Sequence, residues 1–315
     1  MHVLSRPEAG FYGTHSVATD PGGEGWAALN SLVGSPAELA ASVRNLVVHR
    51  EGCARYGFTL PDDRRNEAET RYVSGFLTVL RGLSGDDGHD GHDGPGDGEA
   101  PLDLIAERRP EARLAGTCRD FALLFAAALR HNGIPARLRC GFMTYGEGGP
   151  EFRGDHWVTE YWRPGKGWTL ADPEFGGYDP DFDPMDVPRD RFLVAGDAWR
   201  LCREGKDDPA NFGVRIPDVL DLTGLSMLRG NVVRDLAALN KVEVLPWDVW
   251  GLAELETEPD DASLALLDRV ADLGSAGGAF EALREAYEEN PGLKITAPVT
   301  SYTTYGGVRI VEIRE

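Results

Sequence analysis

The chain has 315 residues, enough for one large domain or two ordinary ones, and its 42% hydrophobic and 27% charged residues are typical of a soluble globular protein. Its formal net charge of −20 argues against nucleic acid and anionic membrane surfaces as partners, because phosphate binding requires clustered Lys and Arg. No stretch approaches the roughly 18 apolar residues of a membrane-spanning helix, and the N-terminus lacks an apolar signal-peptide core. Four widely spaced cysteines form no metal-binding pair, so a reduced cytoplasmic setting is the simplest interpretation; they are Cys53, Cys118, Cys140 and Cys202.

Two helices are expected in the first part of the chain. Residues 1–35 are rich in Gly, Pro and Ser and show no clear period. Ser35 is a typical N-cap and Pro36 a typical first helical residue, and the apolar spacing that follows predicts a helix over 37–49. A second amphipathic pattern predicts a helix over 71–83.

Residues 84–100 are a run of Gly, Asp and His. His89 and His92 lie among carboxylates, so a metal site is one interpretation of the run. The composition favours the other, a flexible acidic loop too polar to pack. We therefore expect neither a metal nor a cofactor.

The stretch from Gly116 to Pro135 predicts a helix with both ends marked. Thr117 and Asp120 form a capping-box pattern at its start, and Asn132-Gly133 followed by Pro135 supplies the stop signals. The sequence between them is mostly apolar, so we expect a helix buried on nearly all sides. Cys118 occupies its first turn, where the helix dipole tends to lower the pKa of a thiol.

Three antiparallel strands are expected after this helix, at 136–145, 155–163 and 168–172, with a tight reversal over 164–167. A helix followed by such strands indicates an α+β fold. Further helices are expected near 191–202, 231–242, 261–273 and 279–288, and a strand–turn–strand hairpin over 293–313 around Gly306-Gly307.

Cys118, His156 and Asp172 stand out as a candidate catalytic set. A thiol nucleophile needs a base to accept its proton, and the base needs a third group to fix its tautomer. A loop centred on Pro164 would place His156 directly opposite Asp172 in the predicted hairpin, within reach of a side-chain contact. A two-residue turn at Gly165-Lys166 would shift the register, and the contact would then require a bulge.

Four further residues are candidates for substrate binding: Trp157, Arg153, Asp155 and Trp247. Trp157 alternates to the face opposite His156, which favours core packing over substrate contact. Arg153 and Asp155 are placed near the mouth of the site. Trp247 lies in an aromatic segment beside Pro246 that is a candidate cleft wall or a packed corner.

Residues 113–175 resemble the transglutaminase-like superfamily, the papain-related group that includes transglutaminases and peptide N-glycanases. The matching motifs are Gly116-Thr117-Cys118-Arg119-Asp120-Phe121-Ala122, Asp155-His156-Trp157-Val158 and Leu170-Ala171-Asp172-Pro173. The resemblance implies Cys118 as nucleophile, His156 as base and Asp172 as its orienting partner, on a helix packed against an antiparallel sheet. The segments 229–235 and 245–248 are more loosely similar to uncharacterised bacterial proteins of this superfamily.

The resemblance has limits. The animal cross-linking enzymes carry an aromatic residue after the cysteine, whereas this chain has Arg119, and nothing here resembles their calcium sites. For the chain as a whole we expect three parts packed as one unit: an N-terminal helical part over 1–110, a transglutaminase-like core over 111–200, and a helical extension with a terminal hairpin over 201–315.

The expected activity is acyl transfer at an amide or thioester carbonyl of a small molecule or peptide. Water as acceptor would make the protein an amidase or peptidase, and an amine would make it an amide-forming enzyme. The alternative is a binding or assembly module that keeps the fold without catalysis. The oligomeric state stays open.

Overall fold

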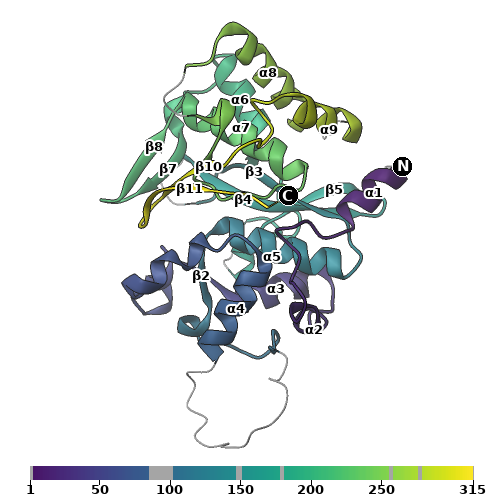
Figure 1. Ribbon diagram of the computed structural model, residues 1–315, viewed down its shortest axis with the longest axis vertical. Coiled ribbons are helices and arrows are strands. Elements are labelled where there is room, and N and C mark those ends of the chain that lie inside the picture. The colour runs from purple at the N-terminus through teal and green to yellow at the C-terminus, as the bar shows by residue number, and fades with distance from the viewer. Residues whose placement is uncertain are drawn as a thin grey trace, which may run out of the picture.

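The computed structural model describes residues 3–84, 102–146, 151–177, 181–254, 258–275 and 279–314. It has the mixed α+β architecture expected from the sequence, with a central sheet between two groups of helices (Figure 1). Among these described ranges, no helix is long and apolar enough to cross a membrane. His89 and His92, and with them nearly all of the acidic run over 84–100, lie outside the described residues.

The central sheet has six strands in the order β6-β3-β4-β7-β8, with β5 pairing to β4. All pairs are antiparallel except β4 with β7. The strands are β3 (Ala136–Met143), β4 (Arg153–Arg163), β5 (Gly167–Ala171), β6 (Phe192–Val194), β7 (Phe212–Ile216) and β8 (Leu220–Thr223). The three predicted strands are thus confirmed as β3, β4 and β5, whereas the β7–β8 hairpin was not predicted.

Helix α5 (Cys118–His131) packs against β3 and β4, and every residue from Cys118 to Arg130 is buried. Its predicted ends are confirmed: Thr117 is the N-cap, and Gly133 has a φ of 72°, the left-handed conformation that terminates helices. On the same side of the sheet lie α2 (Gly25–Leu29), α3 (Pro36–Leu46) and α4 (Val73–Ser84) (Figure 1).

The helix predicted over 37–49 is shorter than expected. Ser35 is the N-cap, as predicted, and forms a capping box with Glu38, but α3 ends at Leu46. Val47–His49 instead forms β1, which pairs in parallel with β2 (Leu114–Gly116). The β-branched Val47 and Val48 suit a strand better than the last turn of a helix. Strand pairing therefore brings His49 beside Gly116, immediately before α5.

A second group of helices covers the other side of the sheet (Figure 1). It comprises α6 (Ala195–Arg203), α7 (Leu225–Leu239), α8 (Asp261–Ser275) and α9 (Phe280–Glu289). The two helices predicted over 261–273 and 279–288 are confirmed as α8 and α9. Two other helices differ at their starts, because residues 192–194 form β6 before α6 and because α7 begins earlier than residue 231.

The predicted terminal hairpin is confirmed and belongs to a small sheet with the order β11-β10-β9. These strands are β9 (Asp248–Val249), β10 (Val299–Thr303) and β11 (Gly307–Val311). The remaining elements are α1 (Arg6–Tyr12) and short 3-10 helices at Cys53–Tyr56, Asp62–Glu69, Pro110–Ala112, Phe175–Gly177, Pro209–Asn211 and Gly251–Ala253. The six-stranded sheet continues beyond residue 200 into β7 and β8, and the three-part division of the chain stays a prediction.

Candidate active site

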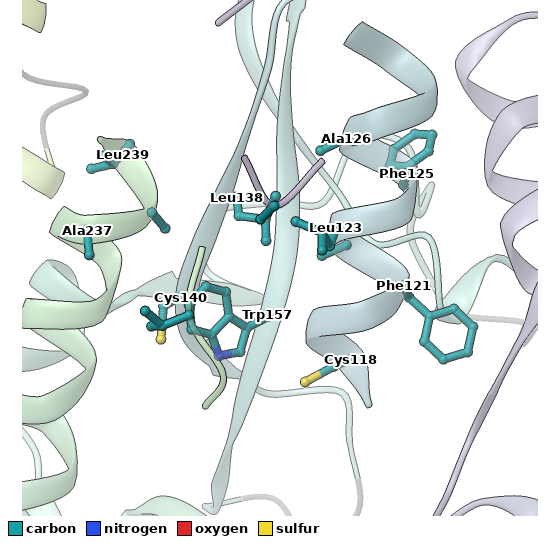
Figure 2. Packing of buried hydrophobic residues seen from close by; sticks show 14 of the residues in the cluster. Cys118, Phe121, Leu123, Phe125, Ala126, Leu138, Cys140, Trp157, Ala237 and Leu239 are labelled. Atoms are coloured by element: carbon teal, nitrogen blue, oxygen red, sulfur yellow. The ribbon is translucent and has the colours of Figure 1, made fainter. Parts of the chain in front are cut away.

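Cys118 is the first residue of α5, and the start of this helix is held from several directions. The Thr117 N–H donates to Asp120 Oδ2 at 2.8 Å, and the Asp120 N–H donates back to the Thr117 carbonyl at 2.9 Å. The buried Arg119 donates to the carbonyls of Glu243 and Val244 at 2.5 and 3.2 Å. In Figure 2 Cys118 lies at the end of α5, with its sulfur turned toward the strands. The thiol is therefore fixed in place, with 9% of the residue exposed.

His156 and Asp172 are in direct contact. His156 lies on β4 opposite Gly141 of β3, and its Nε2 is 2.7 Å from Asp172 Oδ2. The rings of Tyr145, Phe175 and Phe192 surround the imidazole at centroid separations of 6.2, 5.7 and 6.3 Å. The imidazole is therefore enclosed by aromatic edges and anchored at one nitrogen.

This contact arises from a register that neither sequence alternative anticipated. The hairpin has a three-residue loop, which pairs Arg163 with Gly167 and Thr159 with Ala171. Gly165 and Gly167 have φ of 82° and 99°, which only glycine adopts without strain. Asp172 is the first residue after β5, and its N–H donates to the Pro184 carbonyl at 2.7 Å instead of continuing the ladder. Both predicted registers are wrong, and the side chain reaches His156 because the chain leaves the sheet at Asp172.

Four hydrogen bonds hold the Asp172 carboxylate. Oδ2 accepts from His156 Nε2 and from the Tyr145 hydroxyl, both at 2.7 Å. Oδ1 accepts from the backbone N–H groups of Glu174 and Phe175 at 3.0 and 3.3 Å. Since both oxygens are saturated with donors, the site is built for an ionised carboxylate.

Cys118 and His156 form a coupled pair. Burial lowers the pKa of His156, but the charges of Asp172 and Cys118 and the hydrogen bonds to both outweigh it, so the pKa lies well above 6.5. Burial raises the pKa of the Cys118 thiol above 9.0, and the charge and hydrogen bond of His156 are what oppose it. Because Nε2 is bonded to Asp172, Nδ1 is the nitrogen left for the thiol. The pKa of Cys118 is thus raised by burial, the opposite of the lowered thiol pKa expected from the helix start alone.

A cavity of about 1080 Å³ opens over this pair. Its wall includes Cys118, His156, Glu174 and His49, together with apolar residues of the β7–β8 hairpin. Ligand pockets of small molecules span roughly 300–1,000 Å³, so the volume admits a small molecule or a short peptide segment. The three candidate catalytic residues therefore meet at an accessible surface, with Asp172 behind His156.

The structure separates the four predicted substrate-binding residues into two pairs. Asp155 and Trp247 line the cavity. Trp157 does not, because it is 1% exposed and packed in the core beside α5 (Figure 2). Arg153 is also absent from the wall, since its guanidinium pairs with Asp207 at 2.9 Å and lies over the Phe212 ring. The structure therefore places Trp157 and Arg153 outside the wall of this cavity, and substrate contact by them stays a prediction.

Three residues of the site were missed by the sequence analysis: His49, Tyr145 and Glu174. Glu174 lines the cavity with 9% of the residue exposed, and its Oε2 has no hydrogen-bond partner among the described residues. Burial raises the pKa of this carboxyl to about 7. Glu174 could have been suspected from the sequence, because it follows Asp172 by two residues. His49 and Tyr145 carry no such local signal, since tertiary folding alone brings them to the site.

No metal centre was found within the part of the chain that the structure describes, where no three His, Cys, Asp or Glu side chains are arranged to hold an ion. The four cysteines are all free. The titratable groups on the cavity wall include the Cys118 thiol, the His156 imidazole and the Glu174 carboxyl.

Comparison with known proteins gives one match. Residues 90–173 match the family model of the transglutaminase-like superfamily, a segment that contains Cys118, His156 and Asp172. Neither the curated proteins nor the solved structures that were searched gave a match. The motif resemblance, the helix on an antiparallel sheet and the family model agree, and the segment over 90–173 is similar to the core of the transglutaminase-like superfamily.

Proposed function

We propose that this protein is a thiol enzyme that transfers an acyl group from an amide or thioester through a thioester on Cys118. The observation that carries the proposal is the meeting of a helix-start cysteine with an anchored His–Asp pair at the wall of one cavity. Members of the transglutaminase-like superfamily commonly carry out Cys-based acyl transfer, which supports the same chemistry.

In the first step His156 acts as base. Nδ1 takes the proton from the Cys118 thiol, and the sulfur electron pair forms a C–S bond to the substrate carbonyl carbon. The C=O π electrons move to oxygen and give a tetrahedral oxyanion. The Cys118 N–H is among the first four N–H groups of α5, which have no partner within a helix, so it is available to the oxyanion.

The intermediate then collapses. The bond to the leaving amine or thiol breaks, the leaving group takes the proton from His156 Nδ1, and the acyl group remains on sulfur. Asp172 holds the imidazole through Nε2 in both steps and stabilises its protonated form. In the second half His156 takes a proton from water or an amine as it attacks the thioester, and the Cys118 thiolate departs.

The substrate class proposed is a small molecule or a peptide segment. The cavity wall combines polar residues near Cys118 with apolar ones such as Val214, Leu220 and Met227. Such a mixture, mostly apolar with a few polar groups near the reacting atoms, is usual for small-molecule sites.

The test is to trap the acyl-enzyme. The protein is mixed with a p-nitrophenyl ester or an acyl thioester, quenched in acid and weighed intact, and peptide mapping then locates the adduct. We expect one acyl group on Cys118 and none in Cys118→Ala.

Cys202 provides an internal control for thiol reactivity. It is 8% exposed against 9% for Cys118, and burial raises its pKa to about 11 without an imidazole beside it. Iodoacetamide should therefore alkylate Cys118 at least about 10-fold faster than Cys202. Equal rates at the two cysteines, or an adduct that survives Cys118→Ala, would contradict the assignment of the nucleophile.

A binding or assembly module is the competing function. It predicts that Cys118→Ala keeps the full biological phenotype. The saturated carboxylate of Asp172, built to anchor a base, supports the enzyme instead.

A further inference from the structure

We propose that His49 supplies the second hydrogen bond to the oxyanion, through its Nε2–H. This inference rests on the proposed acyl-transfer function and adds a catalytic residue to it. His49 is the last residue of β1 and pairs with Gly116 of β2. Gly116 in turn lies two residues before Cys118 in the chain. His49, Cys118 and His156 all line the same cavity.

The strand β1 is held tightly against the start of α5. The Arg50 N–H donates to the Gly116 carbonyl at 2.9 Å, which extends the pairing one residue past His49. A Cβ on Gly116 would lie 2.9 Å from the Asp120 side chain and 3.0 Å from that of Val47, so the absence of a side chain there permits the close approach. His49 is thus fixed relative to Cys118 by backbone hydrogen bonds instead of by a flexible loop.

The tautomer of His49 is set by its neighbour. The Glu51 backbone N–H lies 3.2 Å from His49 Nδ1, which must therefore be the unprotonated acceptor nitrogen. In a neutral imidazole the proton is then on Nε2. No hydrogen bond to His49 Nε2 occurs among the described residues, so this N–H is available to a ligand in the cavity.

The charge state of His49 suits this role. Burial, together with the charges of Arg50 and His156, lowers its pKa to about 3. An imidazole of such low pKa is a much weaker base than His156 and does not compete with it for the thiol proton, but its Nε2–H can donate a hydrogen bond to a developing oxyanion, a use of neutral histidine known in enzymes. His49 and His156 therefore differ in task, one as donor and the other as base.

Trp157 is the alternative donor in this region. Its indole Nε1–H is buried and has no hydrogen-bond partner among the described residues. However, Trp157 is 1% exposed and does not contribute to the cavity wall, so a substrate oxygen in the cavity does not reach it. The geometry favours His49.

The experiment compares two reactions of Cys118 that differ only in the oxyanion. Acylation by a p-nitrophenyl ester passes through a tetrahedral oxyanion, whereas alkylation by iodoacetamide displaces iodide without one. Removing an oxyanion donor costs about 10²–10³-fold in rate. We expect His49→Ala to slow acylation by about 10²-fold and to change the alkylation rate of Cys118 by less than about 3-fold.

Three further variants keep the proposal falsifiable. His49→Phe preserves the ring without its N–H and should slow acylation as expected for His49→Ala. It replaces His49→Ala in the comparison if circular dichroism shows that the smaller residue impairs folding. His49→Gln restores an N–H donor and should recover acylation to within about 10-fold of the wild type. His131→Ala is the matched control, because His131 lies at the far end of α5, bonded to Asn30, and it should leave both rates unchanged.

Two results would overturn the role of His49 as oxyanion donor. Acylation and alkylation that fall together would assign His49 to the thiolate pair or to folding, and acylation unchanged in His49→Phe would exclude the donor role; either result overturns the proposal. A wild-type protein that forms no acyl-enzyme would overturn the proposed function itself, and this failure is seen before any variant is made.

Discussion

The replacement Asp172→Asn tests how the site orients its base. The amide has nearly the size of the carboxylate, so the fold should be kept, but it has only one acceptor oxygen. Asp172 Oδ2 receives two donors, His156 Nε2 and the Tyr145 hydroxyl, and Oδ1 receives the N–H groups of Glu174 and Phe175. Whichever way the amide is turned, its NH₂ group faces donors, so no orientation satisfies the site.

The expected magnitude follows from these bonds. Loss of the charge-assisted bond to His156 costs about 3 kcal/mol, and the mismatched amide N–H adds about 1 kcal/mol. A barrier higher by about 4 kcal/mol corresponds to an acylation rate about 10³-fold lower. In addition, removal of the Asp172 charge lowers the pKa of His156, which the carboxylate holds well above 6.5, and this weakens the base.

The measurement is the single-turnover rate of acyl-enzyme formation as a function of pH, with circular dichroism to confirm folding. Asp186→Asn is the matched control, because Asp186 pairs with Lys166 and Arg163 away from the cavity and should leave the rate unchanged. A loss of less than about 10-fold in Asp172→Asn, with the fold intact, would refute the orienting role of Asp172.

Two further predictions concern stability. The pKa of Glu174 is about 7 in the folded protein, against 4.5 for the same carboxyl in the unfolded chain. Between these pH values the folded state keeps a proton that the unfolded chain has lost, so the free energy of unfolding falls as pH rises. Glu174→Gln removes this cost and should raise the free energy of unfolding by about 3 kcal/mol at pH 8, with no gain near pH 4; a gain independent of pH in urea titrations would contradict it. Asp235→Ala should lower the free energy of unfolding by about 3–5 kcal/mol, because Asp235 accepts from the buried Arg139 at 2.8 and 3.0 Å. Asp221→Ala, which removes an exposed pair with Arg215, should cost under about 1 kcal/mol in the same assay.

The elements that the sequence predicts well are those with local signals. The capping residues Ser35 and Thr117 and the stop at Asn132-Gly133 act within one helical turn, so they are readable without the fold. The alternation of the strands after α5 likewise reflects burial on two faces of a sheet. These signals were sufficient to place Cys118 at a helix start, His156 on one strand and Asp172 at the end of the next.

The details of the site depend on tertiary structure that such signals do not contain. The hairpin register follows from the length of the loop around Gly165, and the contact of Asp172 with His156 follows from the Pro184 carbonyl that draws the chain out of the sheet. His49 was assigned to the end of a helix, because only the pairing of β1 with β2, more than sixty residues apart in the chain, shows that these residues form a strand. Long-range pairing is the part of the fold that single-sequence periodicity does not encode.

The pKa of Cys118 shows why this distinction matters for the chemistry. The helix start alone favours a thiolate, and burial in the assembled fold reverses that preference. What opposes the burial is the charge and hydrogen bond of His156, and the basicity of His156 depends in turn on Asp172. The reactivity of Cys118 therefore depends on the helix, β4 and the end of β5 packing together, because His156 is the group that takes the thiol proton and its basicity comes from Asp172. Desolvation, which makes the thiolate costly at rest, also strengthens each hydrogen bond to the oxyanion, so the same burial that raises the thiol pKa favours the transition state once His156 has taken the proton.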